Sequence, residues 1–396
     1  MTVLRFLFHV FIADTPRAAG NQQTIRIAYY LARAGANVTL YVGTSYFGSR
    51  QDLMSFFGLN ECDRFEVIIQ RTPGRIKKSS KAQSRWGMIF HFRRLMHLLF
   101  TNEKHRYDVF FARGYRFPTL HVLLKQWLGY KVVFELHEII YLDKVPEDSL
   151  FVAKPFIDFE KYTFLHADGR LAISQSLLDF ADRKWGVVRP ARAIHSCAIP
   201  FDSNPIPPNR VLKKVYYVGN FYPLGGLDYL VRAMPLVPDA HLTVVGGGGE
   251  NDLNTLRILD VIDDCKVCDR IDLTGFVEPG KLSDYYRGAD ILVMPLANFI
   301  RCKYWMSPLK LFEYLSARRP IIASDHPVVR EILKHEHNAI LVPAENPKAI
   351  AGAIERLMGD RELCRRLAES AYRDSRIYTM DNKAKQILEF IEEEIP

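Results

Sequence analysis

The chain has 396 residues, of which 48% are hydrophobic and 25% are charged, and its formal net charge is +8. This composition excludes a disordered chain, and the length predicts two domains of roughly 150–200 residues each. Val3–Ala13 is apolar, but it is too short to span a bilayer and lacks the cleavage site of a signal peptide. We therefore expect a soluble or peripheral protein, cytoplasmic by default.

Six cysteines are scattered along the chain, which fits a reducing compartment better than a disulfide framework. Cys265 and Cys268 form a C-x-x-C pair, but no two further ligands lie at the spacing of a zinc site. We expect no metal, no redox use of this pair and no resident cofactor.

In the first half, short apolar runs alternate with helical patterns, which is typical of parallel βαβ units. A helix is expected over Ile25–Arg33, and the expected strands are Leu4–Ile12, Val38–Val42, Asp108–Ala112, Val132–Leu136 and Arg170–Ile173. A run rich in proline then interrupts the pattern at Pro200, Pro205, Pro207 and Pro208. We interpret this run as a linker that follows a first domain over residues 1–203.

The pattern restarts after the prolines, with a helix over Leu227–Met234 and strands at Lys214–Val218, His241–Val245, Arg270–Leu273, Ile291–Met294, Pro320–Ala323 and Ala339–Val342. The fold class is therefore α/β, with two successive doubly wound, Rossmann-like domains, the second over residues 209–378. A last helix near Asp381–Glu394, within residues 379–396, is expected to pack back on the first domain. Such sheets bind ligands at the carboxyl ends of their strands.

The segment Ser307–Ser316 carries the most informative pattern. Pro308 suits the first turn of a helix, whose N-terminus offers free N–H groups to a phosphate. A lysine in that first turn is normally disfavoured, so Lys310 makes sense if an anion binds there. Glu313 lies on the same helix face, where its carboxylate could accept two ribose hydroxyls. The alternative is an exposed Lys310–Glu313 ion pair on an ordinary helix.

With the segment that follows it, to Ser324, this helix resembles the signature of retaining glycosyltransferase family 4, which has the GT-B fold. Further matching fragments are Leu31–Gly35, Glu135–Glu138, Val218–Asn220, Gly225–Leu230, Val244–Glu250, Leu273–Val277 and Tyr285–Pro295. The resemblance implies that a nucleotide sugar is bound by Ser307, Pro308, Leu309, Lys310, Glu313, Gly219, Asn220, Gly275, Phe276 and Gly20.

At three positions the chain departs from the family pattern. Trp305 stands where the first glutamate of the paired-glutamate motif is expected, so Glu313 corresponds to the second. Asn220 and Gly225 stand where many members carry an arginine and a lysine that hold the diphosphate. Lys310 and the helix N-terminus would then neutralise more of the charge, and the branch is atypical.

His137 follows an expected strand at the predicted ligand-binding edge. A histidine there can bond a sugar hydroxyl or stabilise charge, and the resemblance implies a catalytic role. The alternative is a structural histidine satisfied by Glu138. Gly20, after Ala18 and Ala19 in the first loop, would let backbone N–H groups approach a ligand, although a simple turn is an equal alternative.

A glycine run at Gly246–Gly249 invites a dinucleotide interpretation, but the third glycine of that fingerprint is replaced by Asn251. The glycines are more consistent with a tight turn. No D-x-D occurs in the sequence. We therefore expect metal-independent departure of the diphosphate. As a separate expectation, the nucleotide is UDP or GDP.

The positive charge is concentrated in one segment. Ten lysines and arginines and only Glu103 as an acid lie between Arg71 and Arg106. Aromatic residues are interleaved with them, which favours binding to an anionic membrane surface through Lys77, Lys78, Arg85, Arg93 and Arg94. The alternative is a partly buried helix with solvated charges. No nucleic-acid-binding module is visible.

Taken together, these patterns predict a retaining glycosyltransferase that moves a sugar from a nucleotide-diphosphate sugar to a glycan or lipid-linked acceptor. Two alternatives stay open. One is another activity on the same fold, such as sugar-nucleotide epimerisation. The other is a catalytically silent scaffold, because Trp305, Asn220 and Gly225 replace polar residues.

Overall fold

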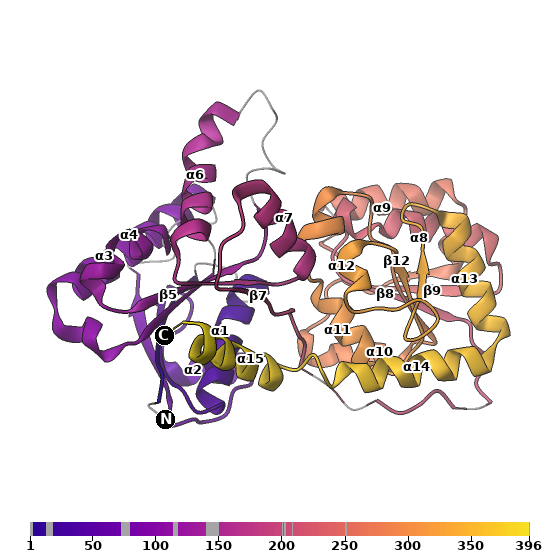
Figure 1. The fold of residues 1–396 in the computed structure, drawn as a ribbon. Helices are drawn as coiled ribbons and strands as arrows, with labels where there is room; N and C mark the ends of the chain where they lie inside the picture. The colour runs from indigo at the N-terminus through magenta and orange to yellow at the C-terminus, as the bar shows by residue number, and fades with distance from the viewer. Residues whose placement is uncertain are drawn as a thin grey trace. The chain divides into compact units, whose positions relative to one another are not determined.

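The chain forms two compact units. Unit 1 comprises Met1–Ile194 and Met380–Pro396, and unit 2 comprises His195–Thr379. In each unit helices cover a parallel sheet, as Figure 1 shows. The computed structural model describes residues 3–12, 19–72, 80–113, 118–139, 150–199, 201, 203–207, 209–249 and 252–395.

Unit 1 contains a seven-stranded parallel sheet in the order β3-β2-β1-β4-β5-β6-β7. The direction of the strand order reverses between β1 and β4, which makes this position the topological switch point where open sheets bind ligands. The strands are β1 (Arg5–Ile12), β2 (Asn37–Thr44), β3 (Phe65–Arg71), β4 (Val109–Arg113), β5 (Lys131–Leu136), β6 (Gly169–Ala172) and β7 (Ala191–Ala193).

Helices cover both faces of this sheet because alternate strand residues point to opposite sides. Phe6 and Phe8 of β1 share a core with α1 (Ala19–Arg33), α2 (Arg50–Phe57) and α15 (Met380–Glu394). On the opposite face, His9 contacts Phe90 of α3, and Phe110 of β4 stacks on His121 of α4. The remaining helices of unit 1 include α3 (Ser80–Phe100), α4 (Pro118–Leu128), α6 (Leu150–His166) and α7 (Gln175–Trp185).

The last helix, α15, returns to the first sheet. Its residues Ile387, Phe390 and Ile391 are buried in the core of unit 1. Arg192 of β7 makes an ion pair with Glu394 near the end of the helix. The chain therefore passes between the units twice.

Unit 2 contains a six-stranded parallel sheet in the order β10-β9-β8-β11-β12-β13, with its switch point between β8 and β11. The strands are β8 (Lys214–Val218), β9 (His241–Val245), β10 (Ile271–Leu273), β11 (Ile291–Met294), β12 (Ile321–Ser324) and β13 (Ile340–Val342). The helices are α8 (Leu227–Ala233), α9 (Leu253–Asp264), α10 (Leu282–Gly288), α11 (Leu309–Ser316), α12 (Pro327–Arg330), α13 (Pro347–Gly359) and α14 (Arg361–Ser375).

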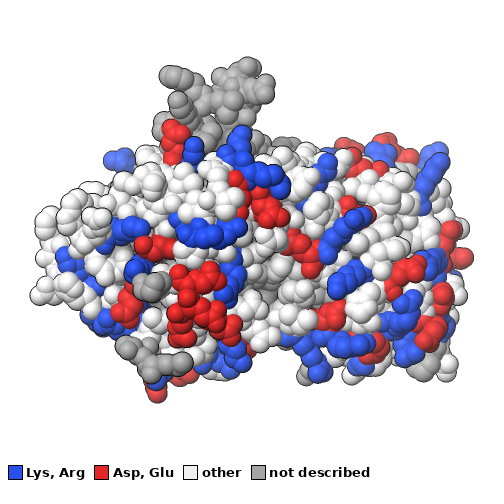
Figure 2. Space-filling view, in the orientation of Figure 1, with Lys and Arg blue, Asp and Glu red and all other residues white. Residues whose placement is uncertain are grey.

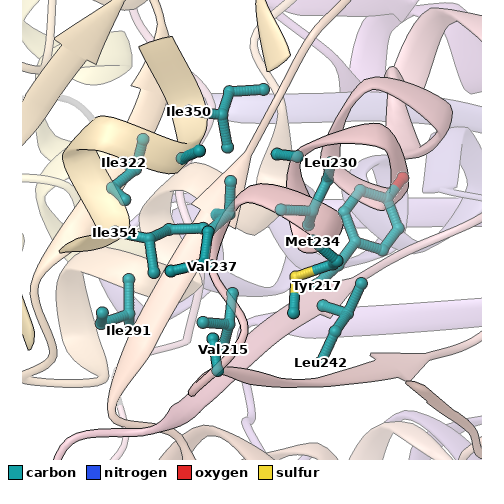
Figure 3. Close-up of a cluster of buried hydrophobic side chains, with 14 of the residues drawn as sticks. Val215, Tyr217, Leu230, Met234, Val237, Leu242, Ile291, Ile322, Ile350 and Ile354 are labelled. Atoms are coloured by element: carbon teal, nitrogen blue, oxygen red, sulfur yellow. The ribbon is translucent and has the colours of Figure 1, made fainter. Parts of the chain in front are cut away.

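The strands of unit 2 are buried on both faces, which explains why they read as continuous apolar runs. On one face Val215 and Tyr217 pack with Leu230, Met234 and residues of α13, as Figure 3 shows. On the other face α10, α11 and α14 cover a second cluster that includes Met294 and Phe312.

The division between the units falls at Ile194/His195, ahead of the proline-rich run that the sequence suggested as a linker. His195 Nε2 lies 2.7 Å from Glu331 Oε2, and Ser196 N donates to Ser307 Oγ at 3.2 Å. These contacts hold the segment before the prolines to unit 2. Among the described residues, no helix is both long and apolar enough to cross a membrane.

Candidate active site

In unit 2, the two loops that flank the switch point touch each other. One loop follows β8 and the other follows β11. The backbone N–H of Ala297 donates to Leu224 O at 3.1 Å. A Cβ on Gly226 would lie 1.7 Å from Pro295 O, so only glycine allows this approach. The loops thus form one continuous rim at the carboxyl edge of the sheet.

Backbone hydrogen bonds at glycines connect the ends of β8, β9 and β10. Gly219 N donates to Val245 O at 2.9 Å, and Gly246 N donates to Gly275 O at 3.0 Å. A Cβ on Gly246 would stand 2.3 Å from Gly219 O, which excludes any side chain there. Next to this glycine platform, Asn220 and Phe276 are exposed to solvent.

Helix α11 begins at the same edge. Its first residue is Leu309, and Pro308 precedes it with an extended ψ of 120°. Pro308 is therefore the capping residue. The sequence had suggested that it lies in the first turn of the helix, which is wrong by one position. It makes no side-chain cap, so the first N–H groups of α11 remain without that partner. The Ser307 hydroxyl accepts from Ser196 N, which fixes the approach to the helix.

Lys310 lies in the first turn of α11, directed at the glycine platform. Its Nζ is 4.3 Å from the ring centroid of Tyr217 and 3.4 Å from the Cβ position of Gly219. Within the described part of the chain, its ammonium makes no hydrogen bond or salt bridge. Burial lowers the pKa of Lys310 to about 8, an effect that Cys302 and Glu313 partly offset. An anion bound beside Gly219 would favour the charged form and raise this pKa again.

Glu313 lies one turn further along α11. Its Oε2 accepts from the hydroxyl of Tyr286 at 2.6 Å. No salt bridge joins it to Lys310 among the described residues, so the ion pair weighed as the alternative is not formed. The buried Tyr286 instead fixes the orientation of the carboxylate on the face that Lys310 occupies.

The absence of a side chain at Gly225 has a steric cause. A Cβ on Gly225 would lie 2.5 Å from the hydroxyl of Tyr217, and that hydroxyl donates to Asn220 O at 2.8 Å. Tyr217 therefore fills the space that the side chain of a cation at position 225 would need. The ring of the same tyrosine contacts the Lys310 ammonium, so one residue both excludes the expected cation and holds another.

Trp305 is buried in the core and lies in the short π-helical segment Arg301–Trp305 that precedes α11. The position where family members carry their first glutamate therefore contributes no charge to the site. The neighbouring Cys302 is also buried, with its Sγ 3.5 Å from Leu224 O.

In unit 1, His137 belongs to a buried charge cluster at the carboxyl ends of β4 and β5. Glu135 Oε2 lies 2.6 Å from Arg113 Nε and 3.0 Å from His137 Nε2. Glu135 Oε1 accepts from Lys383 Nζ of α15 at 2.7 Å. Arg113 Nη1 also donates to Gly20 O at 3.2 Å, which ties the start of α1 to the cluster.

The charge states of this cluster follow from its burial. Although burial alone would raise the pKa of Glu135, Lys383 and Arg113 hold it well below its ordinary value. Burial and then Arg113 lower the pKa of His137 to about 4, so the imidazole is neutral near pH 7. Both ring nitrogens of His137 face Arg113: Nε2 lies 2.5 Å from Nε, and Nδ1 lies 2.9 Å from Nη2. Nε2 also lies 3.0 Å from Glu135 Oε2, so the neutral ring carries its one proton on either nitrogen and accepts from Arg113 at the other.

Arg113 and Lys383 were not among the sequence-predicted site residues. A charged residue that ends a buried strand, as Arg113 ends β4, is a signal that could have been used. Lys383 gave no such signal, since it reaches Glu135 only through the return of α15. Gly20 lies in the first turn of α1, and its carbonyl accepts from Thr24 Oγ1 as well as from Arg113.

The basic segment divides into exposed and buried residues. Arg85 and Arg93 are exposed on α3, whereas Lys77 and Lys78 lie outside the described residues. The expectation that Arg94 faces a membrane is wrong: it is buried. Its guanidinium pairs with Glu103 at 2.8 Å and lies 3.6 Å from the ring centroid of Tyr41. Its charge is thus satisfied inside unit 1.

Comparison with known proteins gives two family matches, one for most of unit 1 and one for most of unit 2. Residues 20–197 match the family described as Glycosyltransferase Family 4, and residues 212–360 match Glycosyl transferases group 1. These matches and the fold define a GT-B glycosyltransferase class. The chain belongs to the group 1 glycosyltransferases of family 4.

Among its relatives is an uncharacterized glycosyltransferase of Methanocaldococcus jannaschii, 29% identical over 178 residues, which are 44% of this chain and 43% of the relative. The match thus spans less than half of that relative's length. The fold is similar to that of sucrose-phosphate synthase from Thermosynechococcus elongatus, with a TM-score of 0.78, 18% identity and 98% of each chain covered. HepE from Anabaena, solved with UDP and glucose, gives 0.71 at 15% identity, with 98% of this chain and 100% of HepE covered.

Proposed function

We propose that this protein is a retaining, metal-independent glycosyltransferase that moves a sugar from a nucleoside-diphosphate sugar to a glycan or lipid-linked acceptor. Lys310 is the observation that carries the proposal. It is a half-buried lysine in the first turn of a helix, its ammonium makes no hydrogen bond or salt bridge in the described part of the chain, and it lies beside the backbone of Gly219. A diphosphate is the ligand that this arrangement favours.

The site offers distinct contacts to the parts of a nucleoside diphosphate. Lys310 and the first N–H groups of α11 would hold the phosphates, and the platform around Gly219 and Gly246 lets backbone approach them closely. Glu313, oriented by Tyr286, would accept the ribose hydroxyls. Asn220 and Phe276 at the exposed rim would border the rest of the donor.

These contacts can also promote the reaction. The bond between the anomeric carbon and the terminal phosphate oxygen breaks, and its electron pair goes to the diphosphate. The acceptor hydroxyl oxygen forms the new bond to the anomeric carbon, and its proton passes to the departing diphosphate. The charge that develops on the diphosphate would be stabilised by Lys310 and the α11 dipole, electrostatic assistance that needs no metal ion. The sequence contains no D-x-D to hold one.

His137 is the proposed catalytic residue on the acceptor side. A neutral imidazole can bond a sugar hydroxyl, although its Nδ1 would do so in exchange for Arg113. His137→Ala should lower turnover by about 100-fold with little change in nucleotide affinity. Normal turnover in this variant would make the histidine structural, as one member of the charge cluster.

We propose that the base of the nucleotide-sugar donor is uracil or guanine. HepE, which shares the fold, was solved with UDP, and a relative from Mycobacterium tuberculosis is named as GDP-mannose-dependent. None of the six cysteines forms a disulfide bond, which supports a reducing, cytoplasmic compartment. No resident cofactor or nucleic acid is part of the proposal.

The test is donor turnover by the purified protein. UDP and GDP sugars, with and without a glycan acceptor, should release nucleoside diphosphate at a rate that excess EDTA does not change. An activity lost on chelation and restored by Mg²⁺ or Mn²⁺ would contradict metal independence. Interconversion of the sugar with the nucleotide still attached would indicate the epimerase alternative, and absence of nucleotide binding would indicate a silent scaffold.

A further inference from the structure

Helix α3 exposes large apolar side chains on its outer side. Met88, Ile89 and Phe92 are exposed, and Phe100 is 84% exposed. They recur at helical spacing, while Phe90, Leu95 and Leu98 on the other side of α3 are buried in unit 1. The helix is therefore apolar on both sides, and only one side has a partner within the described residues.

The neighbouring helices extend this surface. Leu123 and Trp127 are exposed on α4, with Trp127 66% exposed, and Phe159 is exposed on α6. Lys104, just after α3, donates through Nζ to Trp127 O at 3.0 Å, so the ends of α3 and α4 are adjacent. Thr119 of α4 donates to Phe159 O at 3.3 Å, which joins α4 to α6. We name these seven residues the apolar face: Met88, Ile89, Phe92, Phe100, Leu123, Trp127 and Phe159.

Basic groups border the apolar face. Arg85 and Arg93 are exposed on α3, between and beside its apolar residues. A hollow of about 400 Å³ next to them is lined by Arg71, Trp86 and Arg93 among others. On the side shown in Figure 2, the surface at the α3 end of unit 1 is mostly white, with blue and some red atoms at its margin.

We propose that the apolar face is a docking surface for an anionic phospholipid bilayer. Apolar side chains spread over three adjacent helices exceed the scattered exposure that is normal for a surface. Exposed arginines beside them suit the combination of apolar insertion and attraction to acidic headgroups. The hollow beside Arg71 and Arg93 has room for a phosphate headgroup. A second copy of the chain would oppose its own arginines, so like charges argue against self-association.

This inference goes beyond the proposed function and does not depend on it. It differs from the sequence-based hypothesis in its residues. Arg94 has no part in it, and Trp127 and Phe159 come from helices outside the basic segment. The proposed donor site lies in unit 2, so lipid binding and nucleotide binding can be measured separately.

The experiment measures binding of the full chain to vesicles of phosphatidylcholine mixed with phosphatidylglycerol, and to phosphatidylcholine alone. The wild-type protein should bind the anionic vesicles more tightly. Phe92→Ser with Trp127→Ser should lower the partition coefficient by about tenfold or more. The matched control is Val187→Ser with Leu253→Ser, which are exposed apolar residues outside the apolar face, and it should bind as the wild type does.

Charge and depth are tested by two further variants. Arg85→Gln with Arg93→Gln should weaken binding to anionic vesicles by about 30-fold, at roughly 1 kcal/mol per basic group, whereas Arg183→Gln with Lys184→Gln on α7 should not. Brominated lipids should quench tryptophan fluorescence of the wild type, and Trp127→Phe should reduce that quenching while it keeps the binding, with Trp86 in the hollow as a second tryptophan near lipid.

Unchanged partitioning in the Phe92/Trp127 variant, with its thermal unfolding also unchanged, would overturn the proposal. So would a dimer in sedimentation that this variant converts to a monomer, since a second copy would then cover the face. Should the serine variant unfold, the Trp127→Phe quenching decides: quenching as strong as in the wild type would overturn the proposal, because Trp127 would then not contact lipid.

Discussion

Lys383 Nζ lies 2.7 Å from Glu135 Oε1, although 248 positions separate the two residues in the sequence. Both side chains are almost completely buried, with 3% and 1% of their surfaces exposed. An unpaired charge at such depth lowers the stability of the folded protein, so each of the two residues needs the other as its charge partner. The pair thereby joins α15 to the strand that precedes His137.

Loss of Lys383 should destabilise the protein strongly. Lys383→Met leaves Glu135 buried with Arg113 as its remaining full charge partner, and it should lower the free energy of unfolding by about 3 kcal/mol or more. Chemical denaturation of unit 1 would measure this loss. Lys385→Met, on the exposed side of the same helix, is the matched control and should change stability little.

A double variant shows whether the loss comes from the pair. Lys383→Met with Glu135→Gln removes both charges and should cost less than the sum of the two single changes, by about 1 kcal/mol or more. Strict additivity would mean that Lys383 stabilises α15 by packing alone.

His137 should make stability depend on pH. Its pKa is lowered to about 4 in the folded protein against an ordinary value of 6.5, so between these values the unfolded chain binds the extra proton. Stability therefore rises with pH through this window and is lost as pH falls. His137→Gln should reduce the slope of unfolding free energy between pH 4 and pH 6.5. The exposed His166 on α6, changed to glutamine, serves as the control; equal slopes for wild type and His137→Gln would contradict the assignment.

Lys310 and Glu313 should affect different parts of the donor. Lys310→Ala should weaken nucleoside diphosphate by about 1.5–3 kcal/mol in calorimetry and leave the nucleoside almost unchanged. Glu313→Ala should weaken both alike, because both carry the ribose. Since the pKa of Lys310 is about 8 in the free protein, diphosphate affinity should also fall as pH rises above that value.

The control for Lys310 is Lys348→Ala. Lys348 is exposed in the first turn of α13, again after a proline, but it does not adjoin the glycine platform. This variant should bind diphosphate normally. Equal losses of diphosphate and nucleoside in Lys310→Ala would show that the phosphates bind elsewhere.

The contact between Gly225 and Tyr217 predicts a coupled pair of substitutions. Gly225→Ala places a methyl group 2.5 Å from the buried Tyr217 hydroxyl and should destabilise unit 2 by about 1–3 kcal/mol. Tyr217→Phe removes the clashing oxygen, so the alanine should cost less in that background. Gly249→Ala, with open space around its Cβ position, is the control. A cost independent of residue 217 would place the strain in the backbone.

The sequence predicted strands best where they are buried on both faces. β9 and β11 have the bounds that the apolar runs His241–Val245 and Ile291–Met294 indicated. Two strands of the first sheet, β3 and β7, were missed. Both are sheet edges, β7 has three half-buried residues, and β3 mixes apolar with exposed charged residues. Neither offers an uninterrupted apolar run.

In the candidate site, local spacing placed Lys310 and Glu313 on one helix face, but it could not show their surroundings. Tyr217 and Tyr286 come from β8 and α10, and only the sheet topology brings them to α11. For Arg94 a usable signal was present. Arg94 lies four residues after Phe90 and four residues before Leu98. Both of these apolar residues are buried, so helical periodicity assigns Arg94 to the inner side of α3.

Because α15 belongs to unit 1 but follows unit 2 in the chain, the two units cannot finish folding in the order in which they are synthesised. Unit 2 is one continuous stretch, His195–Thr379, and can fold as soon as it leaves the ribosome. Unit 1 emerges first, yet its charge cluster waits for Lys383, which follows the whole of unit 2. Premature termination after Thr379 would therefore leave unit 2 intact and impair the sheet that was made first.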